Sequence, residues 1–384
     1  MKRITILGAT GSVGASTIDL LLRDRERFQV HALTAATDWQ KLAMLARQTG
    51  AAVVVIADEA ARGDLADALA GSGVEVRAGI GALAETAAEP VDLLVAAIVG
   101  AAGLAPTLAA VRAGTNVALA NKEALVCAGD VMTEAARQSG ARLLPIDSEH
   151  NAVFQVLDDI ARVERIVLTA SGGPFRTASH DCMAAASPSD AVRHPTWSMG
   201  AKISVDSATL MNKGLELIEA HHLFGVPPER LAVLVHPQSL VHGLVEYVDG
   251  SVLAQLGPAD MRVPIAHALA WPDRMETPVR RLDLASIGRL DFEEPDRVRF
   301  PALRLAETAL AEGDCRPCVL NAANEVAVAA FLDGRIGFLD IAAVVEDTLQ
   351  ALPRFGLTCL DAVTAADAKA RESARSFAGH RTRR

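Results

Sequence analysis

The N-terminal fold is decided by the sequence Ile4-Thr5-Ile6-Leu7-Gly8-Ala9-Thr10-Gly11-Ser12-Val13-Gly14. An apolar run typical of a strand passes directly into glycines at positions 8, 11 and 14, and a helical pattern follows at 17–23. Small residues at such a junction let the backbone approach a pyrophosphate, and the amides that open a helix attract its charge. The motif is therefore a variant of the dinucleotide-binding fingerprint, although glycine turns between a strand and a helix also occur without a ligand.

The first 150 residues repeat the alternation that this motif begins. The expected strands are 4–7, 30–33, 53–57, 74–77, 93–98, 116–120 and 143–146, and helical spacing lies between them, for example at 41–48. Strands that alternate with helices predict parallel βαβ units. We therefore expect an α/β protein whose residues 1–147 form a doubly wound, Rossmann-like, dinucleotide-binding domain.

The pattern changes after residue 150. Expected strands at 166–169, 231–235, 244–247 and 252–255, with Asp249-Gly250 as a hairpin turn, predict a central α+β catalytic domain at 148–272 with a mainly antiparallel sheet. It contains an expected helix at about 207–224 and a polar, weakly patterned stretch from 176 to about 199. Residues 273–300 are expected to be a linker. Helical patterns at 302–311, 319–332, 340–352 and 362–378 predict a C-terminal helical bundle at 301–384.

The composition excludes several classes of protein. Among 384 residues, 51% are hydrophobic and 22% charged, and the net charge of −10 disfavours a nucleic-acid partner. Glycines interrupt the N-terminal apolar run, and no eighteen-residue apolar run follows, so neither a signal peptide nor a membrane span is expected. Five cysteines, an odd and sparse set, indicate a reducing compartment, and we expect a cytoplasmic protein.

Polar residues gather where two of the later strands end. Asn121-Lys122-Glu123 follows the sixth strand, at the sheet edge where ligands of doubly wound sheets bind, although Asn121 could simply cap a helix. Asp147 and Glu149 follow the seventh, and in an extended chain they would project to the same side. Two such carboxylates favour Mg²⁺ or Mn²⁺ between them. The alternative is a helix start with Ser148 as its cap.

A third cluster lies on the expected helix at 207–224. Asn212, Lys213 and Glu216 share one helical face, and Ser207 lies near the expected helix start, where free amides attract phosphate. Lys213 would supply charge for that phosphate, and Glu216 a third metal carboxylate. The alternative is an ordinary solvated Lys–Glu pair. Gly214 counts slightly against it, because glycine weakens a helix.

With these segments assembled, the chain resembles the 1-deoxy-D-xylulose 5-phosphate reductoisomerase family. The matching strings include GATGSVG, LANKEALV, LLPIDSEHNAVFQ, TASGGPF, RHPTWSMGAKISVDSATLMNKGLELIEA and NAANEVAVAAFL, and together they span almost the whole chain. The resemblance implies a homodimeric enzyme that uses NADPH and Mg²⁺ or Mn²⁺. Its implied reaction rearranges and reduces 1-deoxy-D-xylulose 5-phosphate to 2-C-methyl-D-erythritol 4-phosphate, an isoprenoid precursor.

The resemblance also implies site residues. The implied metal ligands are Asp147, Glu149 and Glu216, and the implied catalytic residues are these three with Lys122 and His194. The implied substrate contacts are Lys122, Ser148, Glu149, Ser171, His194, Trp197, Met199, Ser207, Asn212, Lys213 and Glu216, of which His194, Trp197 and Met199 belong to a flexible lid near 176–202. The implied cofactor contacts are Gly8, Thr10, Gly11, Ser12, Val13, Ala36, Asn121, Glu123 and Gly200.

The sequence departs from the family pattern after the second strand. Many relatives have Gly-Lys-Asn there, whereas this chain has Ala36-Thr37-Asp38, so a natural partner of the NADP phosphate is missing. An acidic group at this place can bind the ribose hydroxyls of NAD, but Asp38 also suits the N-cap of the next helix. NADPH remains the expected cofactor.

Two other kinds of protein are compatible with the nucleotide-binding fold. A semialdehyde or homoserine dehydrogenase shares that fold, but a semialdehyde enzyme would need an active-site cysteine, and neither Cys127 nor Cys182 has a histidine neighbour in sequence. A catalytically silent nucleotide sensor would be expected to lack some of the carboxylates or Lys122, and all of them are present.

Overall fold

The computed structural model describes residues 1–197 and 199–381, and these residues form two compact units. Unit 1 consists of Met1–Ala124, Met132–Asn151 and Asp260–Val279. Unit 2 consists of Leu125–Val131, Ala152–Ala259 and the described chain from Arg280 onward. Both units combine separate stretches of sequence. The domain boundaries at 147, 272 and 300 stay a prediction.

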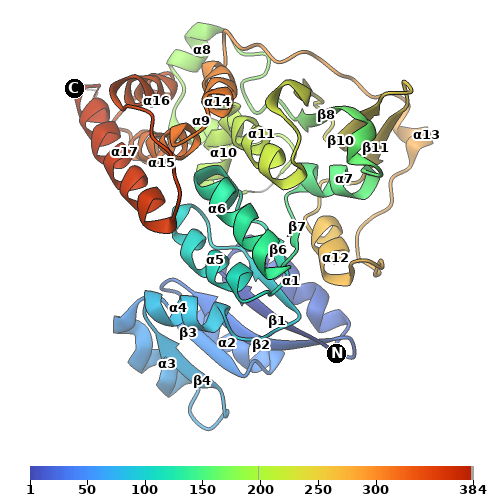
Figure 1. Ribbon diagram of the computed structural model, residues 1–384, viewed down its shortest axis with the longest axis vertical. Helices are drawn as coiled ribbons and strands as arrows, with labels where there is room; N and C mark the ends of the chain where they lie inside the picture. The colour runs from blue at the N-terminus through green and yellow to red at the C-terminus, as the bar shows by residue number, and fades with distance from the viewer. Residues whose placement is uncertain (198, 382–384) are drawn as a thin grey trace. The chain divides into compact units, whose positions relative to one another are not determined.

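Unit 1 contains the seven-stranded parallel sheet that the sequence predicts (Figure 1). Its strands are β1 (Lys2–Leu7), β2 (Phe28–Ala35), β3 (Val53–Ile56), β4 (Glu75–Ala78), β5 (Leu93–Ala96), β6 (Val117–Leu119) and β7 (Leu143–Pro145). Their order in the sheet is β4-β3-β2-β1-β5-β6-β7. The order reverses at β1, which pairs with β2 on one side and β5 on the other, and ligands of such sheets bind at this switch point. The α/β fold class is confirmed.

Helices connect or follow these strands. They are α1 (Ser12–Arg23), α2 (Trp39–Thr49), α3 (Arg62–Ala68), α4 (Ile80–Ala87), α5 (Leu104–Arg112), α6 (Glu123–Ser139), α7 (Ser148–Val156) and α12 (Arg262–Ala270), with single 3₁₀ turns at Glu59–Ala61 and Ala101–Gly103. Helices α1 to α6 connect the strands, while α7 follows the last of them and α12 comes from a later stretch of the chain. Close packing of α1 on β1 requires glycine. A Cβ on Gly14 would lie 2.6 Å from the carbonyl oxygens of Gly8 and Ala9, and one on Gly8 would lie 2.6 Å from that of Ala97.

Unit 2 is built on a four-stranded sheet of order β11-β10-β8-β9. Its strands are β8 (Val163–Ala170), β9 (Leu231–Val235), β10 (Val241–Tyr247) and β11 (Val252–Leu256). Two of the three pairings are antiparallel, and β10 and β11 form the predicted hairpin, in which the Gly250 amide donates to the Tyr247 carbonyl. The helices of this unit are α8 (His180–Ala184), α9 (Pro188–Ala191), α10 (Ala201–Ala208), α11 (Met211–Phe224), α13 (Leu284–Ile287), α14 (Pro301–Glu312), α15 (Arg316–Leu332), α16 (Asp340–Ala351) and α17 (Leu360–His380), with 3₁₀ turns at Ile160–Arg162 and Pro228–Arg230.

The four C-terminal helices of the prediction correspond to α14–α17, and Figure 1 shows α15, α16 and α17 packed side by side. Their cores are rich in alanine and valine. The helix α15 buries twelve of its side chains, including Asn321 and Asn324. The small C-terminal bundle is therefore an alanine-rich helical layer, as the propensity of alanine for helices favours.

One local prediction is wrong, and one segment without a predicted helix contains helices. The expected single helix at 207–224 is two helices, because Leu210 adopts a left-handed backbone (φ 60°) and the Thr209 hydroxyl accepts the amide of Met211. Ser207 therefore lies at the end of α10 and not at a helix start. The polar stretch from 176 to 199 contains α8 and α9, each capped by the hydroxyl of a serine that precedes it.

None of the helices in the described chain is long and apolar enough to cross a membrane. All five cysteines are free thiols, and Cys127, Cys315 and Cys318 are buried.

His267 on α12 makes the stability of unit 1 depend on pH. Its Nδ1 accepts a hydrogen bond from the Asn151 amide (3.1 Å), which requires the neutral ring. Burial and the charge of Arg274 lower the pKa of His267 to about 4, below its ordinary value of 6.5. The folded chain thus binds fewer protons than the unfolded chain between these two values, so stability falls as the pH falls through this window.

We predict that the free energy of unfolding falls by about 1 kcal/mol between pH 7 and pH 5 through His267, after allowance for its partial exposure. In His267→Gln, whose side-chain oxygen can still accept from Asn151, this part of the pH dependence should disappear. Urea unfolding of both proteins at the two pH values measures it. Equal pH dependence in the two proteins would contradict the assignment.

Candidate functional site

The glycine loop between β1 and α1 forms the first part of the candidate site in unit 1. Gly8 has φ 79° and its amide donates to the Thr34 hydroxyl (3.0 Å), while Gly11 and Ser12 are exposed at the start of α1. The first amides of a helix have no partner within it, so they are available to an anion. The loop fits the pyrophosphate of a dinucleotide, because its exposed turn is free of bulky side chains.

The side chain of Asn121, one residue before the N-cap Lys122, makes the capping contact that the alternative interpretation required, and it makes further contacts. Its Oδ1 accepts the amide of Ala124 (2.7 Å), and its Nδ2 donates to the carbonyls of Ile98 and Gly100 (2.9 Å for Gly100). Asn121 therefore ties the loop after β5 to the start of α6. Glu123, the first residue of α6, is buried beside it.

Lys122 and Asp147 join the carboxyl ends of β6 and β7. The Lys122 ammonium lies 2.8 Å from Asp147 Oδ2, and His150 Nδ1 lies 3.2 Å from the same oxygen. Burial would raise the pKa of Asp147, but the charges of Lys122 and His150 outweigh it and hold this pKa well below its usual range. The lowered pKa favours the ionised form of Asp147, which is the form that a cation needs.

Asp147 and Glu149 lie together, but not for the predicted reason. The chain is not extended here, because α7 begins at Ser148. The turn of the helix still places a carboxylate oxygen of each residue within 4.8 Å of the other, and the Ser148 hydroxyl donates to Glu149. The residues of this segment thus present two hard oxygen donors, which suits Mg²⁺ or Mn²⁺.

In unit 2, Ser171 and His194 are brought together. Nδ1 of His194 accepts the amides of Thr196 (3.1 Å) and Trp197 (2.8 Å), so the proton of the neutral ring is on Nε2, which donates to the Ser171 hydroxyl (2.9 Å). Trp197 packs against His242 at a centroid distance of 6.0 Å. The implied lid residues therefore have an ordered anchor at Ser171. Ser198, inside the predicted lid near 176–202, lies outside the described residues.

Ser207 joins this group through the backbone. A Cβ on Gly173 would lie 2.7 Å from the Ser207 carbonyl, so the glycine turn after Ser171 packs closely on the end of α10. Gly172 and Gly173 both have positive φ, at 85° and 67°. The serines at 171 and 207, both implied substrate contacts, are thus on neighbouring backbone segments.

The cluster on α11 is as close as its spacing predicts. Both Asn212 and Lys213 hydrogen-bond to the carboxylate of Glu216, and Lys213 and Glu216 are buried. The solvated-pair alternative is therefore wrong, because a surface pair would be exposed. Gly214 is needed for packing, since a Cβ there would lie 2.4 Å from that of Ala306 on α14.

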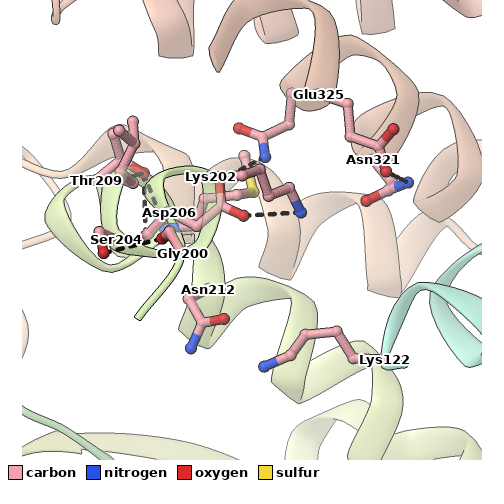
Figure 2. Close-up of polar contacts among 12 residues, drawn as sticks. Lys122, Gly200, Lys202, Ser204, Asp206, Thr209, Asn212, Asn321 and Glu325 are labelled. Atoms are coloured by element: carbon pink, nitrogen blue, oxygen red, sulfur yellow. Dashed lines mark hydrogen bonds and ion pairs between the residues drawn. The ribbon is translucent and has the colours of Figure 1, made fainter. Parts of the chain in front are cut away.

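The sequence did not predict a polar network on α10. Asp206 is buried and accepts a hydrogen bond from Asn324 on α15 (2.8 Å), while Lys202 lies 2.9 Å from its other oxygen. Figure 2 shows Lys202 and Asp206 on α10, with Asn321 and Glu325 on α15. Gly200, an implied cofactor contact, is the N-cap residue of α10, and its carbonyl accepts a hydrogen bond from the Ser204 hydroxyl (3.0 Å). The four-residue spacing of Lys202 and Asp206 in the sequence could have indicated this ion pair.

Another unpredicted contact lies at the glycine loop. Asp38 is the N-cap of α2 and accepts the amide of Lys41 (3.0 Å), which confirms the cap interpretation. The Lys41 ammonium donates to the Thr10 carbonyl (2.8 Å). Ala36, the implied cofactor contact after β2, is exposed.

The parallel sheet, the glycine loop at its switch point and the ionised carboxylate with its lysine define a nucleotide-binding oxidoreductase. Comparison with known proteins makes this specific. Family profiles for 1-deoxy-D-xylulose 5-phosphate reductoisomerase match residues 4–129, its C-terminal domain residues 143–224, and the DXP reductoisomerase C-terminal domain residues 256–373. The chain belongs to the 1-deoxy-D-xylulose 5-phosphate reductoisomerase family.

Individual relatives agree over nearly the full length. The chain is 59% identical to the 1-deoxy-D-xylulose 5-phosphate reductoisomerase of Rhodospirillum centenum, covering 97% of this chain and 94% of that protein. Identity to the Zymomonas mobilis protein of the same name is 57%, with 96% of each covered.

Solved structures of the family have the same fold. The Zymomonas mobilis reductoisomerase in complex with NADPH has a TM-score of 0.94 at 54% identity, covering 98% of this chain and 99% of that one. A DOX-P reductoisomerase in complex with NADPH, fosmidomycin and magnesium has a TM-score of 0.94 at 44% identity, covering 98% of each chain.

We predict that Asn324→Leu lowers the free energy of unfolding by about 1–3 kcal/mol, because it removes a donor to buried Asp206. It should also loosen α10, so trypsin should cleave faster after Lys202. The control is Asn321→Leu on the same helix, whose amide donates to Cys127 and Glu325 and not to Asp206. Equal acceleration at Lys202 in both variants would contradict a specific role of Asn324.

Proposed function

We propose that the protein rearranges and reduces 1-deoxy-D-xylulose 5-phosphate to 2-C-methyl-D-erythritol 4-phosphate, with NADPH and a divalent metal, in isoprenoid precursor biosynthesis. The observation that carries this proposal is the ion pair of Asp147 with Lys122 (2.8 Å) at the carboxyl edge of a nucleotide-binding sheet, in a chain of this family. Relatives have been solved with NADPH and with magnesium.

The metal is assigned to Asp147, Glu149 and Glu216. The residues fit the group, because all three are carboxylates, Asp147 is ionised, and its oxygen lies near that of Glu149. A divalent cation held there would act as a Lewis acid toward the oxygens of the substrate. We propose Mn²⁺ as an alternative to Mg²⁺, because both take hard oxygen ligands.

The remaining residues bind and orient the substrate. Lys122 and Ser148, beside the carboxylates, would contact the sugar oxygens, and Ser171, Ser207, Asn212 and Lys213 would hold the phosphate. Contacts to a phosphate far from the reacting carbons supply binding energy for orientation. His194, Trp197 and Met199 would cover the substrate and exclude water, with the bond from His194 to Ser171 fixing the imidazole.

The dinucleotide is assigned to the residues around the glycine loop and to Gly200. The contacts we propose are Gly8, Thr10, Gly11, Ser12, Val13, Ala36, Asn121, Glu123 and Gly200. The exposed turn at Gly11 and Ser12 supports the pyrophosphate position, and Asn121 braces the neighbouring loop. The nicotinamide would supply the hydride that reduces the rearranged aldehyde.

We further propose a cytoplasmic homodimer. The sparse cysteines, all free, support a reducing compartment. The hairpin of β10 and β11 exposes Val248, Val252 and Leu253 at an edge of the sheet, and exposed apolar edges are commonly covered by a partner.

Oxidation of the reduced cofactor, followed by absorbance at 340 nm, tests the function. We expect oxidation of NADPH that requires both 1-deoxy-D-xylulose 5-phosphate and Mg²⁺ or Mn²⁺, and that stops with EDTA. Metal-dependent oxidation of NADH in preference to NADPH would overturn the cofactor assignment alone. If neither cofactor is oxidised, the assignment of the substrate is wrong.

We predict that Glu216→Gln lowers kcat at least about a hundredfold, because a neutral amide is a poor metal ligand and the Lewis-acid contribution is lost. The dissociation constant of NADPH should stay within about twofold, since Glu216 is not among the cofactor contacts. Steady-state kinetics and cofactor fluorescence give the two values. The control is Glu134→Gln, an exposed acid paired with Arg137 on α6. Near-normal turnover in Glu216→Gln would refute the metal assignment.

A further inference from the structure

Discrimination between NADPH and NADH requires a group that meets the 2′-phosphate of the adenosine ribose. In doubly wound folds this group lies just after the second strand. Here β2 ends at Ala35 and the exposed residues Ala36, Thr37 and Asp38 follow, none of them basic. The carboxylate of Asp38 caps α2, and its negative charge disfavours a phosphate nearby. The positive charge must therefore come from elsewhere.

Lys41 supplies a positive charge at this place. It lies in the first turn of α2, and its side chain reaches back over thirty-one positions of sequence to the glycine loop, where the ammonium donates to the Thr10 carbonyl (2.8 Å). The contact joins the segment after β2 to the loop after β1. These two segments flank the adenosine ribose in dinucleotide-binding folds.

We propose that Lys41 binds the 2′-phosphate and, together with Asp38, sets the choice of cofactor. This inference rests on the proposed use of a nicotinamide dinucleotide. An ammonium has three N–H donors, so its bond to Thr10 leaves two for phosphate oxygens. The start of α2 adds a partial positive charge, and Thr37 offers a hydroxyl next to Asp38. Many relatives have a lysine at the position of Thr37. Lys41, one helical turn later, thus takes the role of that lysine.

Because Lys41 is positively charged and Asp38 negatively charged, removal of either charge should change the affinity for NADPH in opposite directions. Lys41→Gln should weaken NADPH binding by roughly tenfold to a hundredfold, the loss of one charge-assisted contact to a phosphate, and leave NADH within about twofold. Asp38→Asn keeps a good N-cap residue and removes the repulsion, so NADPH should bind a fewfold more tightly. Lys41→Arg should keep most of the affinity for NADPH.

The experiment measures dissociation constants of NADPH and NADH by nicotinamide fluorescence, with the full chain and without substrate or metal. The matched control is Arg47→Gln, a basic residue in the last turn of α2 whose guanidinium binds the Ala68 carbonyl. It should leave both constants unchanged. Repeating the NADPH titration at higher ionic strength should reduce the difference between wild type and Lys41→Gln.

Equal weakening of NADPH and NADH in Lys41→Gln would overturn the proposal, because Lys41 would then only support the Thr10 loop. Unchanged NADPH binding in that variant would also overturn it. The titration uses no substrate, so it tests cofactor binding separately from the reaction. If the protein prefers NADPH as predicted but does not catalyse the reductoisomerase reaction, the proposed function is wrong and this inference is still supported. A wild type that binds neither cofactor would overturn the inference and the cofactor assignment together.

Discussion

The ion pair between Lys122 and Asp147 is the interaction on which the chemistry of unit 1 depends. Lys122 is only 5% exposed, and a buried charge is costly unless it is paired. The pair satisfies both groups across the ends of β6 and β7, and His150 adds a second contact to Asp147. One consequence is that Asp147 stays ionised. Another is that the two strand ends are held in a fixed register at the edge of the sheet where ligands bind.

The glycine loop depends on an equally strict constraint. Gly8 and Gly14 are required because a Cβ on either would overlap a backbone oxygen: Gly14 lets α1 approach the loop after β1, and Gly8 lets that loop approach Ala97 after β5. Asn121 then holds the neighbouring loop through two carbonyls. In unit 2, the hydrogen bond from Asn324 to Asp206 connects α15 with α10, whose first residues are the last residues of the predicted lid. The C-terminal helices therefore stabilise the segment that bears Gly200.

The sequence predicted the parallel sheet because continuous apolar runs alternate with helical spacing, a pattern that few other folds share. It also predicted the Asn212–Lys213–Glu216 cluster, since helical spacing alone fixes which side chains meet. It failed where a single backbone angle decides the outcome. The left-handed Leu210 splits the expected helix and moves Ser207 to a helix end, and no pattern of apolar residues signals it.

The sequence also could not predict which side chains distant in sequence meet in the folded chain. Asp147 and Glu149 are close because a helix begins at Ser148, the alternative that the sequence left open beside an extended chain. The reach of Lys41 to Thr10 depends on how two βα units pack, so it could not be read from the residues after β2. The family resemblance pointed to a missing lysine after β2, and the contact of Lys41 with Thr10, on which the proposed replacement rests, comes from the structure alone.

The central claim is that Asp147, Glu149 and Glu216 together hold one divalent cation. Titration with Mn²⁺, followed by the electron paramagnetic resonance of the free ion in the presence of 1-deoxy-D-xylulose 5-phosphate and without cofactor, tests it most directly. We predict one site per chain in the wild type and loss of that site in Glu149→Gln, a substitution that leaves the Lys122–Asp147 pair in place. Binding of Mn²⁺ to Glu149→Gln with unchanged stoichiometry and affinity would contradict the account.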